Sequence, residues 1–223
     1  MNVGTCGWSY YPERGDKLLN YASVFNVVEV NSTFYRLPRL STAEKWLKKA
    51  RPVNKDFEFT VKVFQGITHR DRFSSNKSIE YFNSVKSIAK ALEAKWLIFQ
   101  TPKSFKPTDS NIKKLINFFN NIDREDFMIG FEVRWADEWK EEIVRPLFKE
   151  LDIVHVVDPL RQDSFFGDIH YYRLHGFGKN IMYNYTFSDK ELKEVCAKAR
   201  EGDYIMFNNY TMYEDAKRFV GIC

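Results

Sequence analysis

The sequence predicts an α/β protein of one domain, 1–223, folded as a compact parallel (β/α)8 TIM barrel with a degenerate sixth helix. Two observations support this fold: short β-rich runs recur eight times, and helix-like segments separate most of them. Strands that alternate with helices favour parallel pairing through right-handed crossovers, and eight such units close most economically into a barrel. An open doubly wound sheet is the alternative, but no glycine fingerprint follows the first run.

The eight predicted strands are short runs rich in β-branched and aromatic residues. They are Val3 to Gly7, Val27 to Asn31, Phe57 to Val63, Trp96 to Gln100, Phe127 to Val133, Ile153 to Val157, Tyr171 to His175 and Tyr204 to Asn208. The link from Asp158 to Ile169 is too short for a full helix with a loop on each side. We therefore expect the sixth helix to be one turn or absent.

Helix signals lie between these strands. Ser41 to Glu44 and Ser188 to Glu191 both match the capping box, in which a serine and a glutamate satisfy backbone donors at a helix start. Apolar residues at helical spacing predict a helix over Ile79 to Leu92, and similar stripes occupy Ile112 to Phe119 and Trp139 to Leu151.

Composition excludes several classes of protein. With 44% hydrophobic and 29% charged residues, the chain is neither disordered nor collagen-like. No apolar run approaches the roughly 18 to 20 residues of a membrane span, and the first residues do not resemble a secretion leader. We expect a cytoplasmic protein with no membrane partner. Cys6, Cys196 and Cys223 are widely spaced, so we expect three unpaired thiols.

Polar side chains cluster where the predicted strands end, which is the edge of a parallel barrel that carries active sites. Charged residues inside parallel strands must point into the barrel or cap its end, because helices cover the outer face. The predicted catalytic residues are Glu132, Asp158 and His175; the predicted substrate-binding residues are Glu29, Asn31, Tyr35, Lys62, His69, Gln100, Arg134, Arg173, Asn208 and Asn209.

These residue types suit a pocket for an anionic group. Arg134, Arg173 and Lys62 can hold a phosphate or carboxylate, and the catalytic candidates can supply acid and base. Among them we expect His175 to titrate near neutrality. The alternative is a structural ion-pair network, in which Lys62 pairs with Glu29 or Glu132, and Arg173 with Asp158.

Cofactors are not identified by the sequence. A divalent metal could bind Glu132, Asp158 and His175, but no tight ligand spacing favours it. His155 has the opposite strand parity and is predicted to be a core histidine, whereas His69 follows the third strand and caps a loop or contacts substrate.

Aromatic residues make up 17% of the chain, and many lie in the predicted loops after strands. Most are expected to pack in the core or in a lid, while the remainder could stack a sugar or a base. The loop aromatic residues are Trp8, Tyr10, Tyr11, Phe34, Tyr35, Trp135, Phe177, Tyr183, Tyr185 and Tyr210.

Over nearly its whole length the chain resembles the DUF72 family, also called YecE-like. The segments that carry the resemblance are Gly4 to Tyr10, Glu29 to Arg36, Lys62 to His69, Phe99 to Pro102, Phe131 to Trp135, Tyr172 to Gly176 and Phe207 to Asn209. The resemblance implies a TIM-type barrel and marks the strand-end motifs as a site. It implies no activity, and Cys6 departs from the serine more common in the family.

Three functions remain open from the sequence. The leading hypothesis is an enzyme, of hydrolase or isomerase type, that applies acid–base chemistry to a small anionic substrate containing phosphate or sugar. The second is a nucleic-acid-binding or processing protein, because residues 1–111 carry 18 basic and 10 acidic side chains. The third is a non-catalytic ligand-binding protein that uses the same pocket. The oligomeric state is not predicted.

Overall fold

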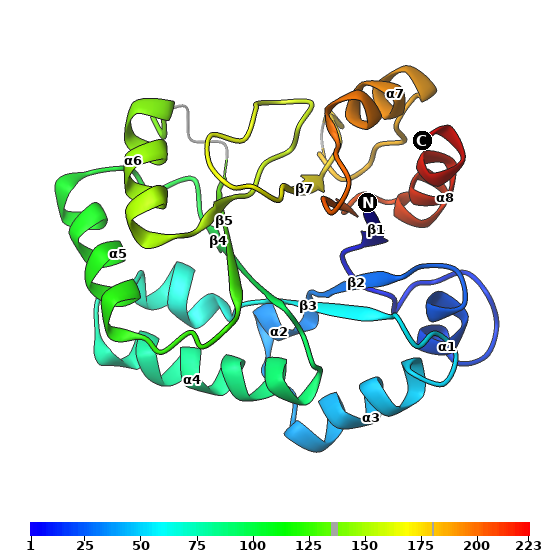
Figure 1. The fold of residues 1–223 in the computed structure, drawn as a ribbon, viewed down its shortest axis with the longest axis horizontal. Coiled ribbons are helices and arrows are strands. Elements are labelled where there is room, and N and C mark those ends of the chain that lie inside the picture. The colour runs from blue at the N-terminus through cyan, green and yellow to red at the C-terminus, as the bar shows by residue number, and fades with distance from the viewer. Residues whose placement is uncertain (135–137, 180) are drawn as a thin grey trace.

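The computed structural model describes residues 1–134, 138–179 and 181–223, and it confirms the predicted barrel (Figure 1). All eight predicted strands are present, each within two or three residues of its expected bounds. They are β1 (Asn2–Thr5), β2 (Val27–Val30), β3 (Glu58–Lys62), β4 (Trp96–Thr101), β5 (Met128–Val133), β6 (Val154–His155), β7 (Tyr171–Leu174) and β8 (Tyr204–Phe207).

The strands pair in parallel in the order β6-β5-β4-β3-β2-β1-β8-β7. The last gap, between β6 and β7, is spanned by a single parallel bridge between Val157 and Tyr172. There the Arg173 N–H donates to the Val157 carbonyl at 2.9 Å. The barrel is therefore nearly closed, and its weakest seam lies beside the shortest strand.

Helices surround the sheet, as Figure 1 shows. They are α1 (Lys17–Ala22), α2 (Ser32–Tyr35), α3 (Leu40–Ala50), the π-helical turn η1 (Gly66–Asp71), α4 (Asn76–Ala91), α5 (Asp109–Asn121), α6 (Glu141–Leu151), α7 (Asp189–Lys198) and α8 (Met212–Ile222). Residues 156–170, all of them described, form no helix between β6 and β7, so the degenerate sixth crossover is confirmed. No described helix is long and apolar enough to cross a bilayer.

The two predicted capping boxes have different outcomes. At α7 the Ser188 side chain accepts from the Glu191 N–H, and the Glu191 carboxylate accepts from the Ser188 N–H, as predicted. At α3 the prediction is wrong, because the helix begins at Leu40 and Ser41 is already inside it. The Arg39 carbonyl accepts the N–H groups of Thr42 and Ala43, so the helix is capped by Arg39, two residues before Ser41.

Alternate strand residues fill the barrel interior. Near the amino ends of the strands, the rings of Trp96, Tyr171 and Tyr204 pack with centroids 5.3 to 5.5 Å apart and plug the barrel. Above this aromatic plug the interior narrows at Gly130, where an added Cβ would lie 2.7 Å from the Val156 side chain and 2.8 Å from the Ile98 side chain of β4. Charged and polar side chains occupy the layers above it.

The cysteine prediction is corrected in part. Cys196 of α7 and Cys223, which follows α8, form a disulfide with a Cα–Cα distance of 5.8 Å. Their separation of 27 residues gave no motif, and only the packing of α7 beside α8 brings them together. Cys6 is a free buried thiol, as expected.

Candidate functional site

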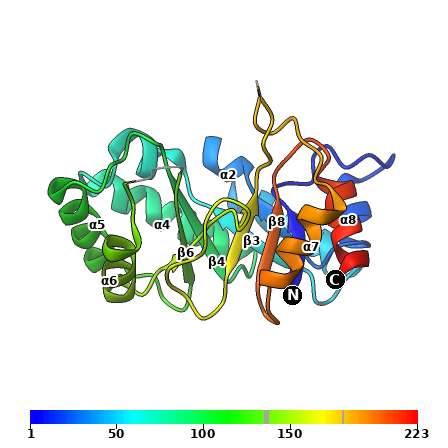
Figure 2. The same cartoon turned by 90° about the horizontal axis from the view of Figure 1, so that it is seen from above.

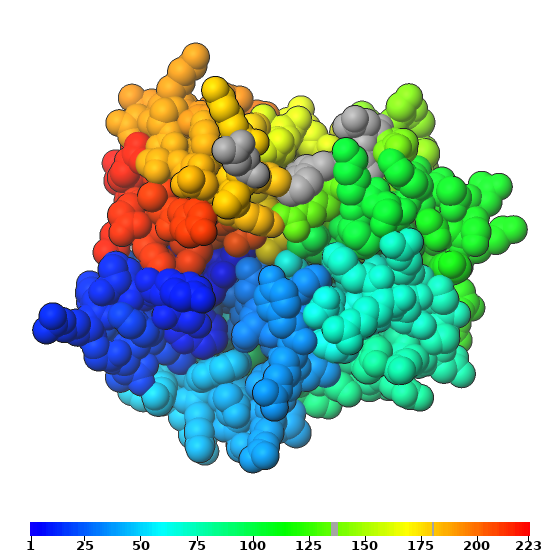
Figure 3. Space-filling view, turned by 180° about the vertical axis from the view of Figure 1, so that it is seen from behind, coloured from blue at the N-terminus to red at the C-terminus, as the bar shows by residue number. Residues whose placement is uncertain are grey.

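The loops that follow the strands gather at one end of the barrel, which we call the mouth. Figure 2 shows this end at the top of the view, and Figure 3 looks onto it. The opposite end, which we call the floor, holds both chain termini. Most of the charged side chains predicted to form a site lie at the mouth or just below it, and several of them are buried.

Arg173 is the centre of the buried charges. Its guanidinium is fully buried, and its Nε and Nη2 donate to the Glu29 carboxylate at 3.0 and 2.7 Å. Nη1 donates to Glu132, and Nη2 lies 3.6 Å from the Cys6 sulfur. Tyr171 adds a hydroxyl bond to Glu29 at 3.0 Å. One cation therefore joins two carboxylates from opposite sides of the barrel.

This network differs from the ion pairs that the sequence suggested. Arg173 pairs with Glu29 and Glu132, not with Asp158, because these three side chains reach the same height in the barrel interior. Lys62 donates to the Gln100 side chain at 2.7 Å, and no described carboxylate lies within ion-pair distance of its Nζ. Arg173 and Glu29 are both 0% exposed, so they support the mouth from below and do not line it.

Glu132 stands between this network and the mouth. Burial, the largest single effect, raises the pKa of its carboxyl, but Arg173 and the neighbouring basic side chains together outweigh burial and lower the pKa to about 2. Its other oxygen, Oε1, lies 3.7 Å from Nε2 of His175 and 4.0 Å from Nε of Arg134. Glu132 is therefore a permanent negative charge at neutral pH.

The expectation that His175 titrates near neutrality is wrong. Its ring is 1% exposed, and burial lowers its pKa to about 3 even though Glu132 acts in the opposite direction. At neutral pH the imidazole is uncharged, with its Nδ1 3.9 Å from the Asp158 carboxylate. The sequence placed the histidine correctly but could not show how completely the barrel desolvates it.

Asp158 has the opposite shift. Burial raises the pKa of its carboxyl to about 6, and the N–H groups of His175 and Leu160, which its oxygens accept at 3.1 Å, only partly oppose this. Arg161 Nε lies 3.7 Å away. A carboxylic acid with such a pKa can exchange a proton under physiological conditions.

Lys62 reaches the mouth from β3. Its Nζ lies 4.2 Å from the centre of the Phe34 ring, which covers it from α2. Burial, helped by the nearby charge of Arg173, lowers the pKa of the amine to about 7. Lys62 is 6% exposed, so it is a lysine that is only partly protonated at neutral pH.

Two arginines and the segment after β7 close the mouth above His175. Arg134 donates to the Tyr183 hydroxyl, and Arg161 donates to the Gly176 carbonyl at 2.5 Å. The cavity beneath them is lined by Glu132, Arg134, Val156, Asp158, Arg161 and His175, among others. Its volume is about 30 Å³, which is enough for about one water molecule.

Two of the other three histidines, His155 and His69, lie where the sequence suggested. His155 is fully buried between the rings of Phe148 and Phe165, so the core assignment is confirmed. His69 lies in η1, with its Nδ1 2.8 Å from the Thr68 hydroxyl and its ring 5.0 Å from Phe34. Burial and the charge of Lys62 lower its pKa to about 4, which places this neutral ring near the mouth.

The predicted asparagines take different positions. Asn209 is buried, and its amide donates to Asp215, to the Tyr185 carbonyl and to Thr211, so it anchors the start of α8. Asn208 makes a backbone hydrogen bond to Leu174 at 2.8 Å and is half-buried. Asn31 donates from Nδ2 to the Cys6 carbonyl at 3.1 Å.

A second cavity opens at the mouth beside the ends of β1 and β2. Its volume is about 390 Å³, and Trp8, Tyr10, Tyr35, Trp46 and Tyr213 supply aromatic walls. In Figure 3 the blue segments that follow β1 and β2 lie side by side on this face. Sequence reasoning missed Trp46 and Arg161 because neither lies at a strand end, which was the only signal used.

The structure gives little support for a metal centre. Within residues 1–134, 138–179 and 181–223, no group of three or more histidine, cysteine, aspartate or glutamate side chains could hold a metal ion. Arg173 already forms ion pairs with the carboxylates of Glu29 and Glu132.

Trp135, which belongs to the matched motif after β5, lies outside the described residues.

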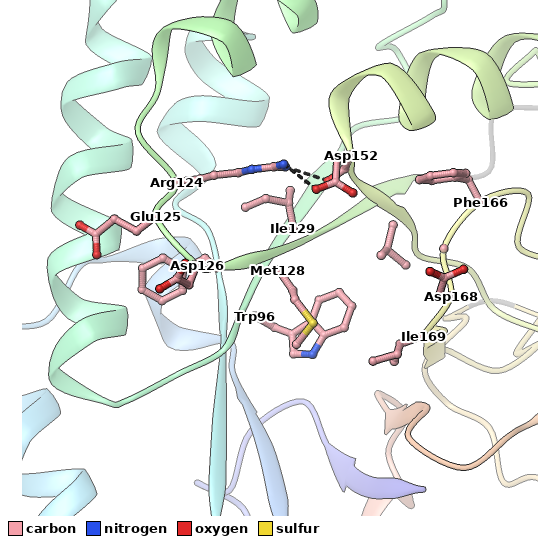
Figure 4. Close-up of a pocket in the computed structure, with 13 residues that line it drawn as sticks. Trp96, Arg124, Glu125, Asp126, Met128, Ile129, Asp152, Phe166, Asp168 and Ile169 are labelled. Carbon is pink, nitrogen blue, oxygen red and sulfur yellow. Dashed lines mark hydrogen bonds and ion pairs between the residues drawn. The ribbon is translucent and has the colours of Figure 1, made fainter.

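The floor carries a cavity of about 400 Å³ (Figure 4). Its walls are Trp96, Met128, Ile169 and other apolar side chains, and its rim is acidic. At this rim Nη2 of Arg124 donates to the Asp152 carboxylate at 2.6 Å, and Nη1 donates to the Asp152 backbone carbonyl. In barrels this end contributes stability, and catalytic residues lie at the other.

Comparison with known proteins supports the resemblance seen in the sequence. The profile of the family described as "Protein of unknown function DUF72" matches residues 2–219. The UPF0759 protein YunF of Bacillus subtilis is 32% identical over 128 residues, which cover 51% of this chain and 44% of YunF. YecE of Escherichia coli K12 is 30% identical over 119 residues, 52% of this chain and 41% of YecE. The matched region therefore spans less than half of each relative.

Solved structures agree over a longer range. A DUF72 family protein of Thermotoga maritima MSB8 superimposes with a TM-score of 0.74 at 25% identity, over 99% of this chain and 98% of that one. SacUVDE gives a TM-score of 0.70 at 9% identity, over 100% and 97%. A D-psicose 3-epimerase, determined in the presence of D-fructose, gives 0.63 at 10% identity, over 99% and 97%. The last two share the fold alone.

Proposed function

Because the chain belongs to the DUF72 family, whose description names no activity, we propose a function from the mouth itself. The protein is an enzyme that transfers protons on a small anionic substrate containing a phosphate or a sugar. Asp158 is the base, Lys62 is the acid, and Arg134 and Arg161 hold the anionic group. His175 and Glu132 orient the reacting part of the substrate.

One observation carries this proposal: two ionisable groups are buried at the same end of the barrel and their pKa values approach each other. Burial raises the pKa of Asp158 to about 6 and lowers that of Lys62 to about 7. Groups whose pKa values lie near the working pH are the most effective proton donors and acceptors. Surface carboxylates and amines have no such shift, and a structural ion pair would move the two values apart.

The surrounding charges support these roles. Arg134 and Arg161 both reach over the mouth, and their hydrogen bonds end on Tyr183 and on the Gly176 carbonyl, which an anionic substrate can replace. Arg173 has no such freedom, because Glu29 and Glu132 surround it. It is a positioning residue that keeps Glu132 ionised and fixed.

The cavity over His175 is too small for a substrate, at about 30 Å³. Substrate entry therefore requires Arg134 and Arg161 to turn away from the segment after β7. A substrate anion that attracts both guanidinium groups provides the force for this change, since charge-assisted bonds to phosphate or carboxylate are stronger than those to a hydroxyl or carbonyl.

The test is a turnover screen of phosphate esters and sugars, ketohexoses included, with wild type and two variants. Asp158→Asn and Lys62→Met are expected to lower kcat by about 100-fold or more, since positioned acid or base groups contribute roughly that much. Asp126→Asn and Lys95→Met change surface charges at the floor and serve as matched controls. A substrate that both mouth variants turn over at the wild-type rate would place the chemistry elsewhere.

The pH profile gives a second, independent readout. Activity should rise as Asp158 loses its proton near pH 6 and fall as Lys62 loses its proton near pH 7, so kcat/KM should peak between these values. Asp158→Asn should remove the acidic limb of any residual activity, and Lys62→Met the basic limb. A flat profile between pH 5 and 8 would contradict both roles.

A second function is favoured by the exposed rings at the mouth. Tyr10, Tyr35 and Tyr210 are 86%, 70% and 70% exposed, and they follow β1, β2 and β8, which are neighbours in the sheet. Such rings can stack the bases of a single strand. Fluorescence anisotropy with labelled oligonucleotides tests this: binding should weaken steeply with salt and be reduced in Arg134→Gln.

A further inference from the structure

We propose that the cavity beside β1 and β2 is a nucleobase subsite, so that the substrate is a nucleoside monophosphate or a close analogue. We call this cavity the ring cavity; it is lined by Cys6, Gly7, Trp8, Ser9, Tyr10, Asn31, Ser32, Tyr35, Trp46, Met212 and Tyr213. The inference deepens the proposed function and rests on it for the anionic end of the ligand.

The ring cavity has the size and walls that a flat ring needs. Its volume is about 390 Å³, within the usual range of small-molecule sites. Trp8 is held edge-on against Trp46, with centroids 5.1 Å apart, and packs at 6.2 Å on Phe59 of β3. These contacts fix the indole of Trp8, so the wall is present before a ligand arrives.

A base fits this lining better than a sugar does. The lining side chains that can hydrogen-bond strongly are Ser9, Asn31, Ser32, the tyrosine hydroxyls and the indole N–H groups of Trp8 and Trp46, and none of them is charged at neutral pH. A pyranose buries several hydroxyl groups, each of which needs a partner. A base presents two apolar faces for stacking and concentrates its polar atoms on its edge.

Asn31 supplies an acceptor for that edge. Its Nδ2 donates to the Cys6 carbonyl, which fixes the orientation of the amide. Its Oδ1 is buried, and within residues 1–134, 138–179 and 181–223 no donor reaches it. A buried acceptor without a donor is costly, and a ring N–H or exocyclic amine of a base would satisfy it.

The ring cavity adjoins the cationic part of the mouth. Val30 of β2 pairs with Val61 of β3, so the next residues, Asn31 and Lys62, leave neighbouring strands at the same level. Adjacent strands are about 4.8 Å apart. Phe34 also links the two sites. The centre of its ring lies 4.2 Å from Nζ of Lys62 and 5.1 Å from the centre of the Tyr35 ring. A ribose is long enough to join a base in one site to a phosphate in the other.

The experiment is isothermal titration calorimetry of the full chain with four probes: AMP, adenosine, ribose 5-phosphate and a single-stranded trinucleotide. AMP is expected to bind at least tenfold more tightly than ribose 5-phosphate, because only AMP carries a base that the aromatic walls can stack. Tyr35→Ala should remove about tenfold of the AMP affinity and leave ribose 5-phosphate unchanged. Tyr210→Ala, which is equally exposed at 70% but does not line the cavity, is the matched control.

The outcomes separate this inference from the proposed function. Equal affinities for AMP and ribose 5-phosphate, or no binding of either AMP or adenosine, would overturn the base subsite. Tighter binding of the trinucleotide than of AMP would assign the rings to a nucleic-acid strand and also overturn it. If adenosine binds as tightly as AMP and Arg134→Gln changes neither affinity, the base subsite is supported while the anionic site of the proposed function fails.

Discussion

The mouth and the floor of this barrel both carry charged residues and cavities of similar size, yet their charges are arranged differently. At the mouth Arg173, Glu132 and Asp158 are buried, and each has a fixed partner. At the floor Asp152 is 82% exposed in its side chain, and its partner Arg124 is 30% exposed. Cavity volume, about 390 against 400 Å³, does not distinguish the two ends. The desolvation of the charges does, because burial moves the pKa values of Asp158 and Lys62 toward neutrality, whereas the floor carboxylate of Glu125 has its pKa lowered by its lysine partners.

The largest effect is expected in the buried charge network just below the mouth. Arg173→Met leaves Glu29 and Glu132 buried without their cation, and breaking a buried pair in this way typically costs about 3 to 5 kcal/mol of the free energy of unfolding. Denaturant unfolding at pH 7 measures the loss. A loss below about 1 kcal/mol would show that the mouth charges are as weakly coupled as those at the floor.

The same variant has a defined pH dependence. Against the effect of burial, Arg173 and the neighbouring basic side chains depress the pKa of Glu132 from about 4.5 to about 2 in the folded state. That carboxylate therefore contributes stability above pH 4.5, and the contribution is lost as the pH falls toward 2. The difference between wild type and Arg173→Met should accordingly shrink below pH 4.5.

Asp158 should show the opposite sign. Burial raises the pKa of its carboxyl from about 3.8 to about 6, so its contribution to stability is present below pH 3.8 and is lost as the pH rises through 6. Asp158→Asn does not ionise, so its stability relative to wild type should increase between pH 4 and pH 7, by about 2 to 3 kcal/mol. Thermal or denaturant unfolding across this range measures the trend. A constant difference would mean that Asp158 is solvated as the floor carboxylates are.

Sequence patterns predicted the fold and which end of the barrel the candidate site residues occupy, because both depend on local periodicity. Eight strand-like runs and one short link were enough for the barrel, and strand parity placed His155 outside it. The partners of Arg173 could not be predicted. Glu29 lies 144 residues away in the sequence, and the two side chains meet only because they point into the barrel interior at the same level. The neutral state of His175 likewise depends on burial, which no single strand-end motif reveals.

The two serines at the predicted capping boxes give a similar comparison, with a smaller expected change in the free energy of unfolding. Helix starts in this barrel face the mouth, and Ser188→Ala removes a side-chain bond to Glu191 there, so it should lower the free energy of unfolding by about 1 kcal/mol. Ser41→Ala changes an exposed position inside α3 and should have almost no effect. Parallel denaturant unfolding of the two variants checks the difference, and equal losses would mean that the capping bond at Ser188 contributes nothing.

The smallest effect is expected at the floor. Asp152→Asn removes the ion pair with Arg124 but keeps the hydrogen bonds that Arg124 donates to the carbonyls of Leu151 and Asp152. Exposed ion pairs contribute about 0 to 1 kcal/mol, and salt screens them, so the loss should fall in that range and shrink further in 1 M salt. Denaturant unfolding at two salt concentrations measures both. A salt-independent loss of the size expected for Arg173→Met would show that the floor charges are also desolvated, and the floor cavity would then be as strong a candidate for ligand binding as the mouth.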